Sequence, residues 1–369
     1  MFEIVGAGPA GLSAALAARA RGAEVMVHEQ RANAGMRFHG DFQGLENWTS
    51  DTDVLAELES LGIQTSFDYT AVREIVCFAP DGSDHRLRAK RPLFYLLRRG
   101  REPGSLDQAL KNQALHAGVT IQFNNRRRHL PNGGAVAEGP HRADVIAVGY
   151  VFDTDMADGC YAAVGERLAG AGYSYLLVDK GRGTLAACLF DRFHDERQFL
   201  DETVAFFRQA AGLRWNNAKR FGGTGNYHHP HGAVLGNRSY VGEAAGFQDA
   251  LFGFGLRHAL ISGHLAGSAG SSNAYDKAWR RRLSALQAAS LFNRWLYARL
   301  GDRGRNILIK YLIAGSDPRR QLQRIYSPAP WKSALSRWLP GQPPQPADSA
   351  HRNCDCTWCR CQRNTAGQE

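Results

Sequence analysis

The chain has 369 residues, of which 44% are hydrophobic and 40 are glycines, so it is long enough for two domains and is not a disordered polymer. Its net charge of +10 predicts an acidic partner, such as an anionic lipid surface or a phosphorylated substrate, while nucleic acid is disfavoured because no known binding module is present. No apolar run approaches the roughly 20 residues of a transmembrane helix. With no signal peptide ahead of Phe2, we expect a cytoplasmic protein.

The first 29 residues carry a dinucleotide-binding pattern. A strand at 2–5, a glycine turn, a helix rich in small residues and a second strand at 25–28 form one βαβ unit. The glycines permit a tight turn, the approach of a pyrophosphate and close helix packing, and the acid after the second strand suits a ribose. The residues predicted to bind the cofactor are Gly6, Gly8, Pro9, Ala10, Gly11 and Glu29, with Gln30 and Arg31 beside the adenosine. The pattern alone does not separate NAD from FAD.

The segment 35–48 is aromatic, polar and rich in glycine, without helical or strand periodicity. We therefore predict a loop, and a loop beside a nucleotide fold often carries function. Its candidates for the active-site wall are Arg37, His39, Asp41 and Trp48; Arg37 is also a predicted cofactor contact. A purely structural crossover explains the composition equally well.

Strands and helices alternate through the next hundred residues. A strand at 92–97 leads to Arg98, a further predicted cofactor contact, and is followed by a helix at 105–116 and a strand at 119–123. The apolar run 143–149 predicts a buried strand that returns to the nucleotide-binding domain.

After residue 150 the pattern favours strands. Segments 173–178 and 184–190 flank a Lys-Gly-Arg-Gly turn, which predicts a β-hairpin. A helix is expected at 198–211. We therefore place a second, sheet-based domain at 151–221.

A second glycine-rich stretch lies at 239–257. A short strand ends at Gly242-Glu243, and a helix is expected from about residue 255 to 269. Here the chain resembles flavoproteins of the glutathione-reductase fold, in which such an acid reaches the ribityl chain of FAD and the following helix points its N-terminus at the flavin. The resemblance implies FAD contacts from Gly242, Glu243, Gly246, Gly253, Phe254 and Gly255.

More narrowly, the chain is similar to the geranylgeranyl-reductase-like branch, whose Tyr-x-Trp strand motif corresponds to Tyr173 and Tyr175. This resemblance implies hydride transfer from flavin to an apolar, isoprenoid or lipid substrate, with NADPH or a ferredoxin-like protein as electron donor. The two tyrosines are then candidate catalytic residues that line the cavity or donate a proton. The chain departs from the branch at Glu243, where Asp is usual, at Tyr175, where Trp is usual, and in lacking the Cys-Gly-Gly element.

Three other functions fit parts of the pattern. A flavin-dependent monooxygenase or halogenase uses the same fold with oxygen. A non-catalytic carrier would pass electrons from flavin to the cysteines of the tail. An NAD-binding protein without flavin would use the first motif alone, and the Gly242-Glu243 stretch disfavours it.

The C-terminal part is basic and then rich in cysteine. Residues 273–314 are predicted to be helical, and their aromatic and basic composition suits either the inner face of a membrane or packing on the rest of the protein. A proline-rich linker precedes four closely spaced cysteines, Cys354, Cys356, Cys359 and Cys361. Such thiolates bind zinc or an iron–sulfur centre, although reversible thiol chemistry or no role is also open.

The expected fold class is α/β. A doubly wound FAD-binding Rossmann-like domain carries an inserted antiparallel sheet for the substrate and is followed by a helical C-terminal region. The predicted domains are 1–150 with 222–270 for FAD, 151–221 for substrate, 271–339 for the basic helices, and 340–369 for the linker and cysteine tail.

Overall fold

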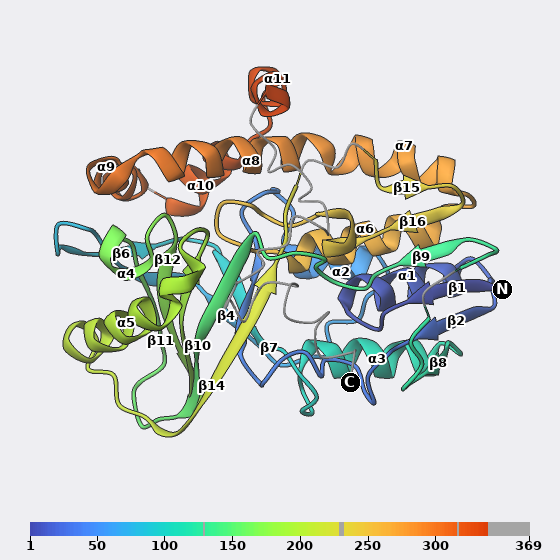
Figure 1. Ribbon diagram of the computed structural model, residues 1–369, viewed down its shortest axis with the longest axis horizontal. Coiled ribbons are helices and arrows are strands. Elements are labelled where there is room, and N and C mark those ends of the chain that lie inside the picture. The colour runs from blue at the N-terminus through green and yellow to red at the C-terminus, as the bar shows by residue number, and fades with distance from the viewer. Residues whose placement is uncertain (128–129, 229–231, 316, 339–369) are drawn as a thin grey trace.

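The computed structural model describes residues 1–127, 130–228, 232–315 and 317–338. Three parts lie side by side in Figure 1: a parallel sheet with its helices, a larger and mainly antiparallel sheet, and a layer of C-terminal helices that extends along both. The predicted α/β class, with an antiparallel sheet added to a Rossmann-like core, is confirmed.

The parallel sheet and its helices draw on both halves of the chain. Its elements are β1 (Phe2–Val5), α1 (Pro9–Ala20), β2 (Val25–His28), α3 (Leu106–His116), β8 (Thr120–Gln122), β9 (Gly134–Val136), β15 (Val234–Leu235), β16 (Arg238–Tyr240) and α6 (Leu256–Ser268). The strand order is β15-β16-β9-β1-β2-β8, with every neighbouring pair parallel except β15 and β16. Only β9 separates β1 from β16, so the two predicted cofactor motifs leave the same edge of one sheet.

Helices α1 and α6 touch through their backbones. A Cβ atom on Gly263 would stand 2.0 Å from the carbonyl oxygen of Ala10, and one on Gly267 would stand 2.1 Å from that of Ala14. Real Cβ atoms do not approach an oxygen so closely, because repulsion rises steeply below van der Waals contact. Glycine at both positions therefore permits the crossing, which fixes the two helix N-termini relative to each other.

The second sheet has seven strands, in the order β14-β10-β13-β12-β11-β5-β6. Only β11 and β5 pair in parallel. The elements of this part are β5 (Glu74–Phe78), β6 (Asp84–Arg88), β10 (Val145–Asp153), β11 (Gly159–Ala163), α4 (Glu166–Ala169), β12 (Tyr173–Asp179), β13 (Arg182–Leu189), α5 (Glu196–Ala210) and β14 (Asn216–Gly225). The predicted hairpin at 173–190 is confirmed as β12 and β13.

This sheet is larger than the segment 151–221 predicted for it. The apolar run 143–149 does not return to the parallel sheet but begins β10, which pairs with β13 and β14. Residues 74–88 add two further strands at the far edge. A short apolar run looks the same for a buried strand of either sheet, so its partner is decided by tertiary pairing and not by local pattern.

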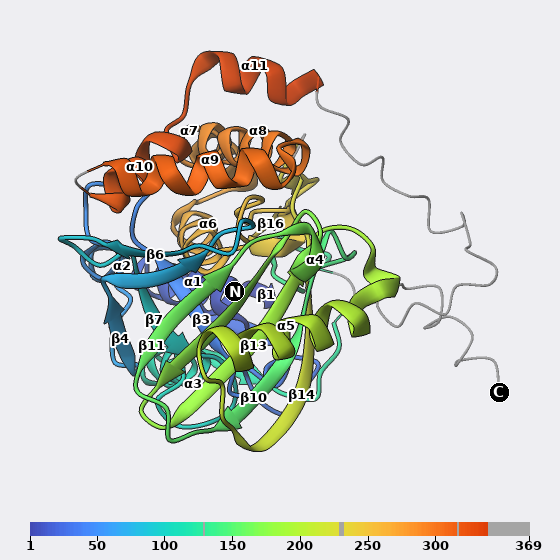
Figure 2. The same ribbon diagram turned by 90° about the vertical axis from the view of Figure 1, so that its left-hand side faces the viewer.

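The two faces of the antiparallel sheet have different roles. Helix α5 covers one face of the sheet (Figure 2), and Leu176 and Val178 of β12 are buried on that face. The alternate residues Tyr173, Tyr175 and Leu177 point to the opposite face, where a cavity lies. Side chains alternate across a strand, so β12 forms a core wall on one side and a cavity wall on the other.

A third, small sheet corrects the prediction of a loop at 35–48. It consists of β3 (Phe42–Glu46), β4 (Tyr69–Val72) and β7 (Phe94–Arg98), and helix α2 (Val54–Ser60) follows β3. Gly44 lies in the middle of β3, and a Cβ there would stand 2.4 Å from the Phe254 ring. A glycine inside a strand weakens the sequence pattern of that strand and often marks a place where another group approaches the backbone closely. This explains why the sequence of the segment predicted a loop.

The C-terminal layer contains α7 (Ser272–Arg282), α8 (Ser284–Arg299), α9 (Gly301–Ala314), α10 (Pro318–Tyr326) and α11 (Pro330–Trp338). The predicted helical region at 273–314 is confirmed as α7 to α9. Tyr275 and Trp279 anchor α7 in the core beneath it, with no exposed surface. No helix in the described part of the chain is long and apolar enough to span a bilayer, and contact of these helices with a membrane surface stays a prediction.

Candidate active site

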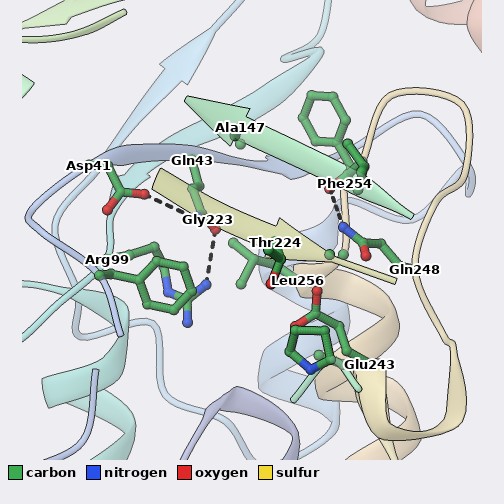
Figure 3. Close-up of a pocket in the computed structure, with 18 of the residues that line it drawn as sticks. Asp41, Gln43, Arg99, Ala147, Gly223, Thr224, Glu243, Gln248, Phe254 and Leu256 are labelled. Carbon is green, nitrogen blue, oxygen red and sulfur yellow. Dashed lines mark hydrogen bonds between the residues drawn. The ribbon is translucent and has the colours of Figure 1, made fainter. Parts of the chain in front are cut away.

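A cavity of about 1100 Å³ lies between the parallel sheet, the inner face of the antiparallel sheet and helix α9. Pockets for drug-sized ligands usually measure about 300–1,000 Å³, so this one has room for a cofactor together with a substrate. Figure 3 shows part of its wall. One end is lined by polar groups and helix N-termini, and the other end is lined mainly by apolar side chains.

The β1–α1 turn forms the polar end through its three glycines. Gly6 has φ +97°, and a Cβ there would stand 2.3 Å from the Ala137 carbonyl oxygen. A Cβ on Gly11 would stand 1.9 Å from the Gly6 carbonyl oxygen, whereas one on Gly8 would meet nothing within 4 Å. Gly8 lines the cavity and is the N-cap of α1 without a side-chain cap. First-turn amides such as that of Ala10 are thus available to an anion, as a pyrophosphate site requires.

Glu29 stands at the end of β2 and lines the same end of the cavity. Its carboxylate accepts a hydrogen bond of 2.8 Å from the Ala7 amide and one of 2.9 Å from the Arg31 amide. These bonds fix the orientation of the carboxylate, and each of its oxygens retains capacity for another donor. The two hydroxyls of a ribose would suit it.

Glu243 and Arg37 form an ion pair on another wall of the cavity. The Arg37 Nη1 atom lies 2.7 Å from Glu243 Oε2, and Nη2 donates to the Thr224 carbonyl. Both charged side chains are partly exposed and line the cavity. The pair brings the predicted acid and a residue of the 35–41 loop to one place, and Glu243 and Thr224 are seen together in Figure 3.

Helix α6 begins at this cavity, and Gln248 lies beside its start. Gln248 was not among the predicted site residues. Gly255 is the N-cap of α6 without a side-chain cap. Gln248 donates from Nε2 to the Gly253 carbonyl at 3.1 Å, and its Oε1 atom is buried without a partner among the described residues. The pyrimidine edge of a flavin carries both N–H and C=O groups, so the orphaned oxygen and the helix amides match it. No pattern around Gln248 marks it out in the sequence.

A chain of hydrogen bonds stiffens another wall of the cavity, and Figure 3 shows its links from Arg99 to Gln43 and from Gln43 to Asp41. Asp107 accepts two bonds of 2.9 Å from the Arg99 guanidinium, which donates to Gln43 at 3.0 Å, and Gln43 donates to Asp41 at 3.0 Å. All four line the cavity. Asp41 was predicted for this wall, whereas Arg99 and Gln43 were not, because the strand that carries Gln43 was not recognised.

The far end of the cavity is the apolar chamber, lined by β12 and by aromatic residues of the loop before α6. The Tyr173 hydroxyl donates to the Phe252 carbonyl, while the Tyr175 hydroxyl has no hydrogen-bond partner among the described residues. Burial raises the pKa of both tyrosines well above its usual range, and the nearby Cys188 adds to this. Both hydroxyls therefore remain protonated at physiological pH, and each is a weaker acid than a free tyrosine.

Most of the predicted site residues meet at this cavity. Those that line it are Gly6, Gly8, Pro9, Ala10, Glu29, Gln30, Arg31, Arg37, Tyr173, Tyr175, Gly242, Glu243, Gly253, Phe254 and Gly255. Their roles toward a cofactor or substrate stay predictions.

Three predicted contacts do not line the cavity. Gly11 lies behind the turn against Gly6, and Gly246 lies against the His228 ring. Arg98 pairs with Asp68 at 3.0 Å and Glu102 at 3.1 Å instead of facing the cavity. The next residue, Arg99, points inward because neighbouring side chains of an extended chain point to opposite sides.

The metal prediction concerns residues outside the described part of the chain. Cys354, Cys356, Cys359 and Cys361 all lie there. Within the described residues, no group of three or more His, Cys, Asp or Glu side chains is placed to hold a metal ion. The three described cysteines, Cys77, Cys160 and Cys188, are free thiols.

Comparisons with known proteins agree with this architecture. A family model described as an NAD(P)-binding Rossmann-like domain matches residues 4–76. No curated protein sequence matches the chain. Among solved structures, a geranylgeranyl bacteriochlorophyll reductase-like protein from Thermoplasma acidophilum superposes with a TM-score of 0.70 at 16% identity, over 92% of this chain and 98% of that one.

Two further structures are named as flavin proteins. The flavin-dependent brominase Bmp2 gives a TM-score of 0.64 at 16% identity, over 91% of this chain and 96% of that one. A flavoprotein/dehydrogenase from Cytophaga hutchinsonii gives 0.62 at 14% identity, over 88% and 91%. The chain therefore has, over nearly its whole length, the fold of these reductase-like and flavin-dependent proteins.

Proposed function

We propose that the chain is an FAD-dependent oxidoreductase that transfers hydride between bound flavin and an apolar substrate. The observation that carries this proposal is the shared cavity. The N-termini of α1 and α6, the carboxylates of Glu29 and Glu243, and the apolar chamber beside Tyr173 and Tyr175 all open into it. An isoprenoid or lipid chain is the proposed substrate class, and NADPH or a ferredoxin-like protein is the proposed electron donor.

The residues of the polar end would bind and orient the cofactor. The first-turn amides of α1 would hold the pyrophosphate, Glu29 the adenosine ribose and Glu243 the ribityl hydroxyls. The start of α6 and the Gln248 oxygen would face the pyrimidine edge, where the positive end of the helix favours negative charge. When bound, FAD supplies the hydride chemistry itself.

The residues of the apolar chamber would position the substrate and supply a proton. Reduction of a carbon–carbon double bond adds hydride to one carbon and a proton to the other. The Tyr175 hydroxyl lines the cavity and has no partner among the described residues, so it can donate that proton. Tyr173 is already bonded to the Phe252 carbonyl and would mainly shape the chamber.

The absorption spectrum of the full chain, purified without oxygen, tests the proposal. We expect flavin bands, and release of FAD when the protein is denatured. A colourless protein that also fails to bind added FAD would overturn the flavoenzyme function.

The same spectrum tests whether the four tail cysteines bind an iron–sulfur centre. Such a centre would add a broad sulfide-to-iron band, which should be absent after the four cysteines are replaced by serine. Zinc has no such band and requires elemental analysis.

A flavin-dependent monooxygenase or halogenase is the second candidate, because the fold is shared with the flavin-dependent brominase Bmp2. Oxygen consumption distinguishes the two. If the reduced enzyme converts substrate under anaerobic conditions, it is a reductase. Strict coupling of one oxygen to each substrate converted would establish the oxygen-using alternative.

A further inference from the structure

Helix α9 places a buried cation in the apolar part of the cavity. Arg305 is only 2% exposed and lines the cavity together with Ile309 and Leu312 of the same helix, which are also buried. Its Nη1 atom bonds to Asp302 at 3.0 Å. Its Nε atom is buried without a hydrogen-bond partner among the described residues. A guanidinium is a donor only and is always charged, so an unsatisfied donor here requires an explanation.

The surroundings of Arg305 do not neutralise this end of the cavity. A second buried guanidinium, Arg294, lies with Arg305 near one aromatic ring: their Cζ atoms are 4.8 Å and 5.3 Å from the centre of the Tyr297 ring. Arg294 bonds to the Leu251 and Ala171 carbonyls and forms no ion pair within the described residues. Among the described residues, Asp302 is the one carboxylate in an ion pair with either cation, and its side chain is 45% exposed. Asp191 acts on Arg294 electrostatically without forming an ion pair.

Burying a charge without a full set of partners costs free energy. Arginine is also the residue that best matches a carboxylate or phosphate, through parallel N–H groups. Because the Arg305 guanidinium lines the cavity, an anion that entered the chamber would meet it and offset the excess positive charge.

From these contacts we propose that the substrate carries an anionic head group, which binds Arg305 while its apolar body lies along the chamber toward Tyr175. The proposal rests on the proposed function in assigning this cavity to a substrate. It specifies how the substrate is oriented in the cavity. The charged end of the substrate lies at α9, and its reacting carbons lie toward the polar end of the cavity, where the cofactor would sit. Carboxylates and phosphate esters share this recognition chemistry, and a neutral alcohol lacks it.

Calorimetric titration of the full chain with three probes of equal length tests the proposal: decanoate, decyl phosphate and decan-1-ol. We expect at least one of the two anions to bind roughly 10- to 100-fold more tightly than the alcohol, as a hydrogen bond to a charged group implies. The better anion identifies the head group. Equal binding of all three probes would overturn the proposal.

Variants on the same helix separate recognition from structure. Arg305→Met should remove the anion preference, and Arg305→Lys should keep part of it. Arg303→Met is the matched control, because Arg303 is exposed on the same helix, and it should bind all three probes as the parent does. A preference that survives Arg305→Met, or that Arg303→Met abolishes equally, would show that Arg305 is a structural cation.

A further variant keeps the test decisive if Arg305→Met does not fold. Asp302→Asn retains an acceptor for Arg305 but removes the competing charge, so anion binding should tighten by about 3- to 10-fold, in the range of a partly exposed ion pair. Unchanged anion binding would contradict the proposal. The flavin content of each sample is measured separately by release of FAD. A chain without FAD that still prefers anions would contradict the proposed function and leave the Arg305 site intact.

Discussion

Arg37 and Glu243 meet at 2.7 Å although 206 residues separate them in the sequence. The contact joins the loop after β2 to the turn after β16, and both side chains line the cavity. Arg37 comes from the segment 35–48 and Glu243 from the second glycine-rich stretch at 239–257. Their ion pair therefore fixes the relative position of two walls of the proposed cofactor site.

Replacing Arg37 by methionine should weaken FAD binding without much effect on stability. The pair is partly exposed, so its loss should reduce the free energy of unfolding by less than about 1 kcal/mol. The Glu243 carboxylate would lose its orientation, and we expect the Kd of FAD to rise roughly 10-fold, equivalent to about 1.4 kcal/mol. Fluorescence titration with FAD measures this. Arg86→Met, which breaks an exposed pair with Glu74, is the control and should leave FAD binding unchanged.

Gly8→Val should weaken cofactor binding while leaving the stability of the fold nearly unchanged. A Cβ at Gly8 meets nothing within 4 Å, so the thermal midpoint should shift by only a few degrees. The added side chain would occupy the space of the pyrophosphate, and FAD affinity should fall by at least 10-fold. Gly270→Val is the control, because Gly270 is exposed and a Cβ there would have one neighbour, at 3.9 Å. If Gly8→Val retained full FAD affinity, the pyrophosphate would have to bind elsewhere.

Arg257→Met should destabilise the fold strongly. The guanidinium lies 2.9 Å from Glu46 and 2.6 Å from Glu57, and all three residues are buried. Removing the cation leaves the buried Glu46 carboxylate without an ion-pair partner among the described residues, whereas Glu57 keeps its pair with Arg282; the expected cost is about 3–5 kcal/mol. Urea unfolding measures the change. Arg88→Met serves for comparison, since Arg88 is 74% exposed in its pair with Glu74, and it should cost less than about 1 kcal/mol. Similar losses in the two variants would contradict the prediction.

Removing the hydroxyl group of Tyr173 should reduce the free energy of unfolding more than removing that of Tyr175. Tyr173→Phe leaves the Phe252 carbonyl without its donor, which should cost about 1–3 kcal/mol of unfolding free energy. Tyr175→Phe removes a hydroxyl that has no partner among the described residues, so it should change stability by less than about 0.5 kcal/mol. Chemical denaturation of both variants tests this order. A larger loss for Tyr175→Phe would reveal a bond of its hydroxyl in the folded protein.

The three described thiols should make the free energy of unfolding fall at alkaline pH. Burial raises the pKa of Cys77, Cys160 and Cys188 to about 12, so each thiol stays protonated in the folded state above the pH at which an unfolded thiol ionises. This contribution is complete below pH 9 and is lost as the pH rises from about 9 toward 12, at about 1.4 kcal/mol per pH unit and thiol.

We would measure the free energy of unfolding between pH 8 and 11 on a chain whose four tail cysteines are replaced by serine. The prediction is that this free energy falls as the pH rises. Replacing Cys77, Cys160 and Cys188 by alanine should reduce the loss of stability at alkaline pH. A thiol reagent at pH 8 should modify the buried Cys160 and Cys188 only after denaturation, and rapid reaction of either one in the native protein would contradict the raised pKa values.

Much of the nucleotide-binding half could be predicted from sequence, because its requirements are local. Gly6, Gly11 and Glu29 occupy positions that the turn, the helix packing and the strand end each demand. The partner of β10 could not be predicted, since an apolar strand fits either sheet. Gln43 and Arg305 also escaped prediction: a glycine concealed the strand of the first, and nothing near the second indicates that its charge is turned inward.

The glycine contacts of α6 on α1 have a consequence for biosynthesis. The βαβ unit that begins the chain is completed only by a helix ending at Ser268. At about 5–20 residues per second, roughly 10–50 seconds of translation separate the synthesis of the first helix from that of its partner. During this interval the face of α1 that packs on α6 lacks its native partner, so the newly made N-terminal segment exposes apolar surface that the native fold buries.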